Sequence, residues 1–396
     1  MYLKALVLLL LALKSYCEQN FTLEQVLILS RHNVRTPLSK NLADFTPKHW
    51  PVWKEKSGYL TAKGALLEGY MGEYFALWLN KQGLLQEKCP KEDIFYVYAN
   101  TAQRTLASAK AFVNKGFPGC EVKIHHTSEP KDPIFNPVVH NTSALFKLEA
   151  IEQMKMLLKS LHLNGSYVDL EEILNYKQSE YCLTEHKCNL LTDTNKIFVN
   201  VGVKPNLEGP LKISKSVIDS FIMENYEGFP KNEVAWGQLK NKEEWNLVLD
   251  LSKGYHSVIF NTTLIARDLA KPLLTYMRDL ILDKKYIISF LMGHDANIYT
   301  VLKSLDFKPY SLKGQYEMTP AGGKLVFQKW KDQNSDFDFL KVEYVYQCTN
   351  QMREGRRLSI DNPPEFTSLQ LEGCKTDDSG FCLWDDFVAL LCSLVD

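Results

Sequence analysis

The chain has 396 residues, a formal net charge of -1 at pH 7 and 45% hydrophobic residues. At about 150 residues per domain, this length predicts two domains. The near-zero charge excludes a protein that attracts nucleic acid or an anionic surface through its overall field, so any affinity for phosphate must come from local clusters of cations. The composition is that of an ordinary globular protein without disordered tracts.

The first 17 residues predict a secretory signal peptide. A single lysine precedes a short apolar run over 5–13, and small residues two positions apart end the segment at Cys17. A lipid anchor on Cys17 fits less well, because Lys14 and Tyr16 match that signal badly. The run is too short for a spanning helix, and no later segment is long and apolar enough to be one. The sequence therefore predicts export to an extracellular or periplasmic location.

The apolar run at 25–30 predicts a buried strand, and it ends in the charged segment 31–37, Arg-His-Asn-Val-Arg-Thr-Pro. Arg31 and Arg35 can each grip anionic oxygens through a planar fork, and His32 between them can act as a nucleophile. Such a cluster suits attack on a phosphate. The alternative is a surface cluster at a strand end that is salt-bridged to nearby acids.

Apolar residues at helical spacing predict a helix that begins after Thr61 and stops at Gly83. A second buried strand is expected at 94–99, followed by another helix with Arg104 in its first turn. The free N–H groups of a helix start favour an anion, so a guanidinium there calls for something negative opposite. That group can be a ligand phosphate or a protein carboxylate.

The pattern of apolar and polar residues changes between 130 and 265. Helical patterns such as 144–161 alternate there with polar loops, and apolar runs typical of strands are scarce. We interpret this stretch as a mainly helical domain inserted between two parts of an α/β domain, 18–129 and 266–396. An aromatic loop at 226–230 either covers a cleft or packs.

After a helix around 271–282, the apolar run 286–291 predicts a third buried strand. It also ends in titratable residues, His294 and Asp295. Open α/β sheets bind ligands at one edge, beyond the carboxyl ends of their strands, so we expect the three charged strand ends to meet there. Alternating runs at 324–329 and 340–347 predict an antiparallel pair at the margin of the sheet.

Cleavage after Cys17 leaves eight of the nine cysteines, and an even set in an exported chain argues for disulfides. A zinc site is disfavoured because no pair has the spacing of a metal knuckle. Sequons for glycosylation occur at Asn20, Asn141, Asn164 and Asn261. The spacing suggests three bridges, namely Cys89 with Cys120, Cys182 with Cys188, and Cys374 with Cys382.

Three segments in this order, the Arg-His-x-x-Arg-x-Pro at 31–37, the lone Arg104 after a strand and the Gly-His-Asp at 293–295, together resemble the histidine acid phosphatases. The resemblance is closer still to the bacterial periplasmic glucose-1-phosphatases and spans nearly the whole mature chain. It implies an α/β, two-domain histidine phosphatase fold with a central mixed sheet flanked by helices and an inserted mainly helical domain. Further similar segments are 50–53, 98–100, 117–120, 135–138, 226–230 and 322–324.

Carried over by position, the family pattern implies that His32 is the nucleophile that becomes a phosphohistidine and that Asp295 donates a proton to the leaving alcohol. Three arginines and an imidazole can neutralise the equatorial oxygens of a phosphoryl group without a metal. Neighbouring cations would also help to keep the nucleophile unprotonated in acid. The phosphate pocket implied by the resemblance comprises Arg31, Arg35, Arg104 and His294.

Four positions depart from the family pattern. Asn33 stands where most histidine acid phosphatases have glycine, and an asparagine at this position resembles the glucose-1-phosphatase-like subgroup. Lys204 aligns with an acidic residue near the sugar site of the bacterial enzymes, and a lysine there would favour a second phosphate on the substrate. Cys348 and Cys392 lack counterparts, and we expect them to form an added disulfide that pins the C-terminus.

On this basis the chain is interpreted as a secreted acid phosphomonoesterase that hydrolyses sugar phosphates such as glucose 1-phosphate through a phosphohistidine, with no metal and no cofactor. The expected partner is a small-molecule phosphomonoester, without nucleic acid or membrane, and the oligomeric state is left open. Two alternatives stay open: a phytase or inositol-phosphate phosphatase, and a non-enzymatic exported binding protein on a phosphatase shell.

Overall fold

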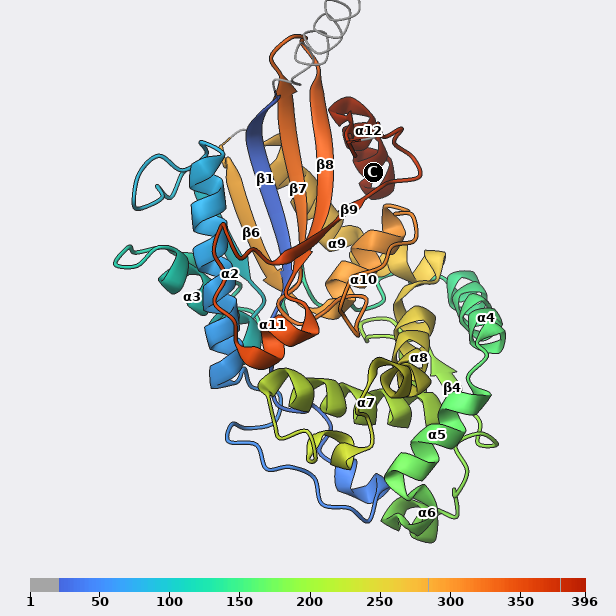
Figure 1. Ribbon diagram of the computed structural model, residues 1–396. Coiled ribbons are helices and arrows are strands. Elements are labelled where there is room, and N and C mark those ends of the chain that lie inside the picture. The colour runs from blue at the N-terminus through green and yellow to red at the C-terminus, as the bar shows by residue number, and fades with distance from the viewer. Residues whose placement is uncertain (1–20, 284, 378) are drawn as a thin grey trace, which may run out of the picture.

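The computed structural model describes residues 21–283, 285–377 and 379–396 (Figure 1). The predicted signal peptide and the sequon at Asn20 lie outside these residues. One mixed sheet has the strand order β10-β8-β7-β1-β6-β2-β3, with β9 also paired to β8. The strands are β1 (Phe21–Arg31), β2 (Phe95–Ala99), β3 (Ile124–His125), β6 (Ile288–Gly293), β7 (Lys324–Asp332), β8 (Asp338–Tyr346), β9 (Glu365–Leu369) and β10 (Cys382–Leu383).

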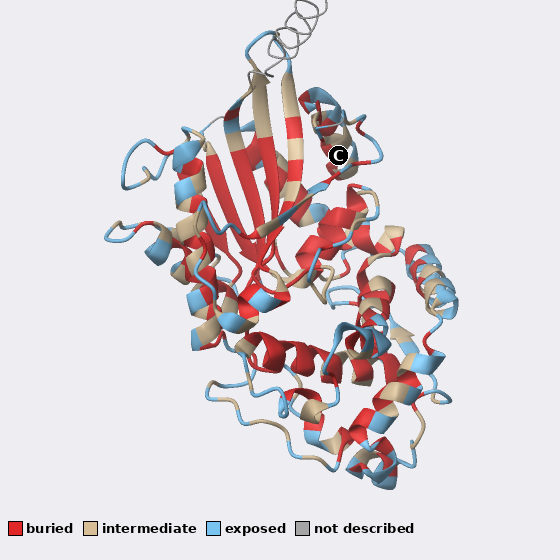
Figure 2. Ribbon diagram, viewed as in Figure 1, coloured by how far each residue is buried: buried red, intermediate tan, exposed pale blue. Residues whose placement is uncertain are grey.

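Strand β1 lies in the middle of the sheet, parallel to β6 and antiparallel to β7. Leu27 and Leu29 pack into one hydrophobic cluster, and Val26 and Ile28 pack into another on the opposite face. Strands buried on both faces are continuous apolar runs in the sequence, which is why this strand was predictable (Figure 2). The predicted antiparallel pair is confirmed as β7 and β8.

Helices cover both faces of the sheet. Met71 and Phe112 contribute to the cluster on one face, and Leu274 and Phe387 contribute to the cluster on the other. No helix among the described residues is both long and apolar enough to cross a bilayer. The first face carries α2 (Ala62–Lys81) and α3 (Gln103–Gly116), and the second carries α9 (Thr263–Leu282), α10 (Asp295–Ser304) and α12 (Trp384–Val395).

Helix α2 begins where the sequence predicts. The Thr61 hydroxyl accepts a hydrogen bond from the N–H of Gly64 at 2.9 Å, which satisfies one of the free donors of the first turn. The helix ends at Lys81, and Gly83 follows with a φ of 82°. A left-handed residue after a helix is most easily a glycine, because it has no Cβ to clash.

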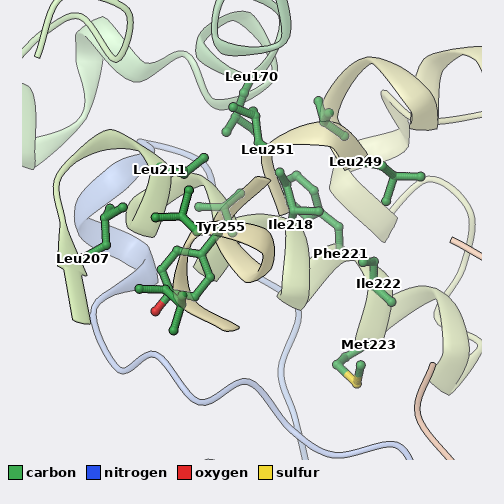
Figure 3. Close-up of a cluster of buried hydrophobic side chains, with 14 of the residues drawn as sticks. Leu170, Leu207, Leu211, Ile218, Phe221, Ile222, Met223, Leu249, Leu251 and Tyr255 are labelled. Atoms are coloured by element: carbon green, nitrogen blue, oxygen red, sulfur yellow. The ribbon is translucent and has the colours of Figure 1, made fainter. Parts of the chain in front are cut away.

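The chain between the two halves of the sheet is mainly helical and supplies most of a third hydrophobic cluster, to which Val34, Leu67 and Tyr299 of the flanking segments also contribute. Ile218, Phe221 and Ile222 of α7 pack against Leu249 and Leu251 of α8 in this cluster (Figure 3). The elements of this region are α4 (Ala144–Ser160), α5 (Asn164–Leu174), α6 (Glu180–Glu185), α7 (Pro210–Glu227), α8 (Lys242–Phe260) and a small hairpin of β4 (Lys196–Phe198) and β5 (Asn206–Glu208).

The division into domains at 130 and 265 stays a prediction, and its second boundary falls within the first turn of α9. The aromatic segment at 226–230 was expected to be a loop, but Tyr226 still belongs to α7. The other aromatic residue of the segment, Phe229, packs against Trp53: the centres of the two rings are 4.9 Å apart in an edge-to-face arrangement.

The structure contains the three disulfides that the spacing suggested: Cys89 with Cys120, Cys182 with Cys188, and Cys374 with Cys382. The prediction of a bridge between Cys348 and Cys392 is wrong, because both cysteines are free. Cys348 precedes the short helix α11 (Thr349–Glu354), whereas Cys392 lies on α12. Figure 1 shows these two helices near opposite ends of the sheet, so the two sulfurs cannot meet.

Candidate active site

The carboxyl ends of three neighbouring parallel strands meet, as expected. Arg31 at the end of β1 is in register with Gly293 at the end of β6, and Ala99 of β2 is in register with Met292 of β6. The residues that follow these strands are therefore neighbours. This arrangement brings His32, Asn100, Arg104, His294 and Asp295 to one edge of the sheet.

His32 is buried, with 3% of its surface exposed. Its Nδ1 lies 2.8 Å from the backbone carbonyl oxygen of Asn33. A carbonyl can only accept, so Nδ1 carries the proton and Nε2 keeps its lone pair. Burial, and then the charge of Arg104, hold the pKa of His32 well below its usual value. The imidazole is therefore neutral and keeps its Nε2 lone pair even in acid.

Arg31 and Arg35 are each held by a carboxylate on a distant segment. Arg31 Nη1 donates to Glu317 Oε1 at 2.7 Å, and Arg35 Nη2 donates to Asp219 Oδ1 at 3.0 Å. Burial lowers the pKa of Arg31, but the carboxylate of Glu317 outweighs burial and raises it, so the guanidinium stays charged. These contacts fix the planar forks in place before any ligand arrives.

Arg104 lies in the first turn of α3, as predicted, and its guanidinium faces an imidazole: Nη2 is 3.4 Å from Nδ1 of His294. Burial and the repulsion of Arg35 lower the pKa of Arg104 to about 10, so it remains a cation below neutral pH. The Nε atoms of Arg31, Arg35 and Arg104 are buried and have no hydrogen-bond partner among the described residues. Three free guanidinium donors in one site fit an anion with several oxygens.

His294 begins the turn into α10, and its backbone N–H donates to Asn297 Oδ1 at 2.9 Å. Because Arg104 can only donate, Nδ1 of His294 accepts, and its Nε2–H donates to Asn100 Oδ1 at 2.9 Å. Burial and the charge of Arg104 lower the pKa of His294 to about 3. The ring is therefore neutral at mildly acidic pH.

Asp295 is the first residue of α10, and 21% of its side chain is exposed. Its Oδ1 accepts the N–H of Ala296 at 2.8 Å, while Oδ2 lies 3.8 Å from Arg31 Nη2 and 3.7 Å from His256 Nε2. Burial raises the pKa of Asp295, but Arg31 and His256 outweigh it and hold the pKa well below the usual value. These neighbours therefore keep the Asp295 carboxylate ionised.

The structure adds site residues that the sequence did not indicate. His256 comes from α8, and its Nδ1 donates to the carbonyl of Ser252 at 2.8 Å, which leaves Nε2 facing Asp295. Asp219, on α7, also pairs with Lys215 at 3.6 Å. The i,i+4 spacing of the latter pair was visible in the sequence. No local pattern marked His256 or Glu317, which reach the site only through the tertiary fold.

Lys204 lies beside the site, on the segment between β4 and β5. It is an exposed residue, and its ammonium lies 4.8 Å from the centre of the Phe260 ring. Partial burial lowers the pKa of Lys204 to about 8, with Asp295 acting to raise it and Lys215 to lower it. The side chain is therefore a cation near the Asp295 carboxyl at acidic pH.

The described residues contain no group of three or more His, Cys, Asp or Glu side chains that could hold a metal ion. The arrangement is a cationic pocket with a neutral imidazole and a nearby carboxylate. These groups can bind a phosphate, attack phosphorus and exchange a proton with a leaving oxygen.

Comparison with known proteins agrees with this chemistry. The chain is 43% identical over 395 residues to the glucose-1-phosphatase of Providencia rettgeri, covering 96% of this chain and 93% of the relative. It is 42% identical over 378 residues to the glucose-1-phosphatase of Salmonella typhimurium, covering 93% and 92%. Among solved structures, the apo form of Hafnia alvei phytase matches with a TM-score of 0.87 and 30% identity, over 95% of this chain and 97% of that one.

A family model also matches most of the chain. It covers residues 22–347 and describes the histidine phosphatase superfamily, branch 2. The match includes strands β1 to β8 and the helices between them. This protein therefore belongs to branch 2 of the histidine phosphatase superfamily, a family of phosphatases.

Proposed function

We propose that the protein is an exported acid phosphatase that hydrolyses phosphomonoesters of sugars, such as glucose 1-phosphate, through a phosphohistidine at His32. The observation that carries this proposal is the free Nε2 lone pair of a buried, neutral imidazole among three arginines with unpartnered Nε donors. The relatives that share 42% and 43% identity are glucose-1-phosphatases, which supports a sugar phosphate as the substrate.

In the first step, Nε2 of His32 attacks phosphorus while Nδ1–H stays bonded to the carbonyl of Asn33. Arg31, Arg35 and Arg104 bind the equatorial oxygens and stabilise the charge of the transition state. The P–O bond to the sugar breaks, and the leaving oxygen needs a proton because a sugar alkoxide is a poor leaving group.

Asp295 passes that proton to the leaving oxygen. Because its protein neighbours keep this carboxylate ionised, the proton arrives with the substrate: below about pH 6 a phosphate ester carries one proton on its phosphoryl group. A bound phosphoryl group also offsets the charge of Arg31, which raises the pKa of Asp295. In the second step the ionised carboxylate takes a proton from water, and the hydroxide releases phosphate from His32.

A second candidate is the hydrolysis of esters that carry more than one phosphate, such as phytate. Lys204 lies within electrostatic reach of Lys215 and Lys212, so positive charge gathers beside the site. A substrate with a second phosphate would find a partner in Lys204, and one of the similar solved structures is a phytase. A non-enzymatic binding protein has less support, because the site keeps every group that turnover needs.

Export is supported by the three disulfides, which form and persist in oxidising compartments.

The deciding experiment measures turnover of glucose 1-phosphate and of phytate at mildly acidic pH, with the mature protein and its His32→Ala variant. We expect activity on the sugar phosphate that disappears in the variant. Stronger turnover of phytate would favour the second candidate. Turnover that survives in His32→Ala would exclude the phosphohistidine route. If the parent protein turns over neither substrate, the interpretation as a non-enzymatic binding protein would be favoured.

A further inference from the structure

A buried ion pair lies next to the segment that carries His32. Glu68 of α2 and Lys324, the first residue of β7, are both 0% exposed, and Lys324 Nζ lies 2.8 Å from Glu68 Oε1. The ammonium also donates to the carbonyl of Gly322 at 2.9 Å and lies 5.5 Å from the centre of the Phe112 ring. The desolvation of two charges offsets much of what such a pair gives to stability. Its position beside the nucleophile suggests another role.

Asn33 connects this pair to the nucleophile. Its Nδ2 donates to Glu68 Oε2 at 2.9 Å, and its Oδ1 accepts the backbone N–H of Val34 at 2.9 Å. A carboxylate only accepts and an N–H only donates, so both ends of the amide are fixed. Each oxygen of Glu68 then has one partner, Lys324 for Oε1 and Asn33 for Oε2.

The backbone of Asn33 holds the imidazole. Its N–H donates to Ser108 Oγ at 3.1 Å, and its carbonyl oxygen lies 2.8 Å from Nδ1 of His32. Gly322 closes the remaining space, because a Cβ at that position would lie 2.2 Å from Asn33 Nδ2. The carbonyl that binds Nδ1–H therefore cannot turn away while the Asn33 amide remains bound to Glu68.

We propose that Asn33, Glu68 and Lys324 are positioning residues that fix the tautomer and the ring orientation of His32. Lys324 holds Glu68, Glu68 holds the Asn33 amide, and the Asn33 carbonyl holds Nδ1–H. Without these contacts the proton can move to Nε2, which removes the lone pair that attacks phosphorus. The inference rests on the proposed phosphohistidine mechanism.

The first test is Asn33→Ala with glucose 1-phosphate as substrate. We expect kcat to fall about 100-fold, the loss that a misplacement of a reacting group by about 1 Å produces. The inhibition constant for inorganic phosphate should stay unchanged, because the three arginines keep their partners. Gln328→Met is the matched control: Gln328 is also buried on β7 and donates to Glu343 at 2.8 Å, so its loss should lower stability but not kcat.

The second test reads the tautomer directly, by nitrogen-15 NMR of protein labelled at histidine, with the His32 signals assigned by their loss in His32→Ala. We expect an unprotonated Nε2 in the parent protein and a mixture of tautomers in Asn33→Ala. This readout needs no turnover, so it distinguishes failure of the inference from failure of the proposed function. A folded Asn33→Ala with the parent tautomer and the parent kcat would overturn the inference.

Two double variants provide a test that does not depend on the folding of Asn33→Ala. Glu68→Gln with Lys324→Met removes both charges but leaves an oxygen for Asn33 Nδ2, whereas Glu68→Leu with Lys324→Met removes that oxygen as well. We expect the first to keep most of the parent kcat and the second to lose about 100-fold, as for the displaced nucleophile above. Equal kcat values in the two double variants would contradict the positioning role.

Discussion

Asp295 is the residue whose proposed role depends on the leaving group. In Asp295→Asn the side chain keeps its shape but cannot pass on a proton. We expect kcat for glucose 1-phosphate to fall by roughly 10²- to 10⁴-fold, the usual contribution of general acid catalysis. Nitrophenyl phosphate should lose much less, because nitrophenolate leaves without a proton.

The measurement is kcat for both esters with the same preparation of parent and variant, so that errors in enzyme concentration cancel in the ratio. An equal loss on the two esters would assign Asp295 to binding or structure instead of proton transfer.

The charge of Arg104 sets where His32 titrates. Burial and Arg104 hold the pKa of His32 well below its usual value, so Arg104→Met should raise that pKa. Protonated His32 has no lone pair, and activity is lost as the pH falls through its pKa. We therefore expect the acidic limb of the kcat/KM profile to move to higher pH in Arg104→Met.

Arg104→Lys is the control for this shift, since it keeps the charge but not the planar fork. Both variants should have lower kcat/KM overall, because both lose contacts with phosphate. Only Arg104→Met should move the acidic limb. An unmoved limb in Arg104→Met would show that burial alone keeps His32 unprotonated.

At the scale of elements, the disulfides differ in the loops that they close. Cys89 and Cys120 are 31 positions apart, and Cys182 and Cys188 are 6 apart. On the chain-entropy model, replacing both cysteines by serine should cost about 4 kcal/mol for the first bridge and about 2 kcal/mol for the second. Urea unfolding of the two double variants measures this difference.

The free thiols give the matched control for these variants. Cys348→Ser with Cys392→Ser removes two cysteines but no bridge, so it should change the free energy of unfolding far less than loss of the Cys89 bridge. A cost as large as that of the Cys89 pair would mean that these cysteines contribute to stability in another way.

The sequence predicted the central elements well because the physics that forms them is local. An apolar run buried on both faces identified β1 and β6, and Thr61 identified the start of α2. The prediction for Cys348 and Cys392 failed because pairing depends on where two distant helices lie. Which cysteines meet is a property of the tertiary fold.

At the scale of the whole molecule, the site is shared between the sheet and the helical region. The sheet edge supplies His32 and Asp295, which strand ends and a family resemblance indicated. The helical region supplies Asp219 and His256 at 3.0 Å and 3.7 Å from their partners. These residues contact side chains that are far away in the chain, so no spacing in the sequence could reveal them.

Lys204 belongs to the helical region, and it tests what that region contributes to substrate choice. In Lys204→Glu a second phosphate would meet a negative charge. We expect the ratio of kcat/KM for phytate to that for glucose 1-phosphate to fall about tenfold, which corresponds to about 1.4 kcal/mol. The effect should shrink at high salt, because the charge is exposed.

Lys196→Glu on β4 makes the same charge change at another exposed position of the same hairpin and should leave the ratio unchanged. An equal effect of the two variants would point to the overall field of the protein. No effect of Lys204→Glu would remove this lysine from substrate recognition.

The Arg35–Asp219 contact also joins the two parts of the molecule, since Arg35 follows β1 and Asp219 lies on α7. Burial raises the pKa of Asp219, but Arg35 and Lys215 outweigh it and hold the pKa far below its usual value. A carboxylate with a depressed pKa gives its full stabilisation above its ordinary pKa and loses it only as the pH falls toward the depressed value. The Arg35–Asp219 ion pair should thus persist at an acidic pH that protonates ordinary surface carboxylates. Acid tolerance of the whole fold then depends on the same arginine that is proposed to hold the substrate.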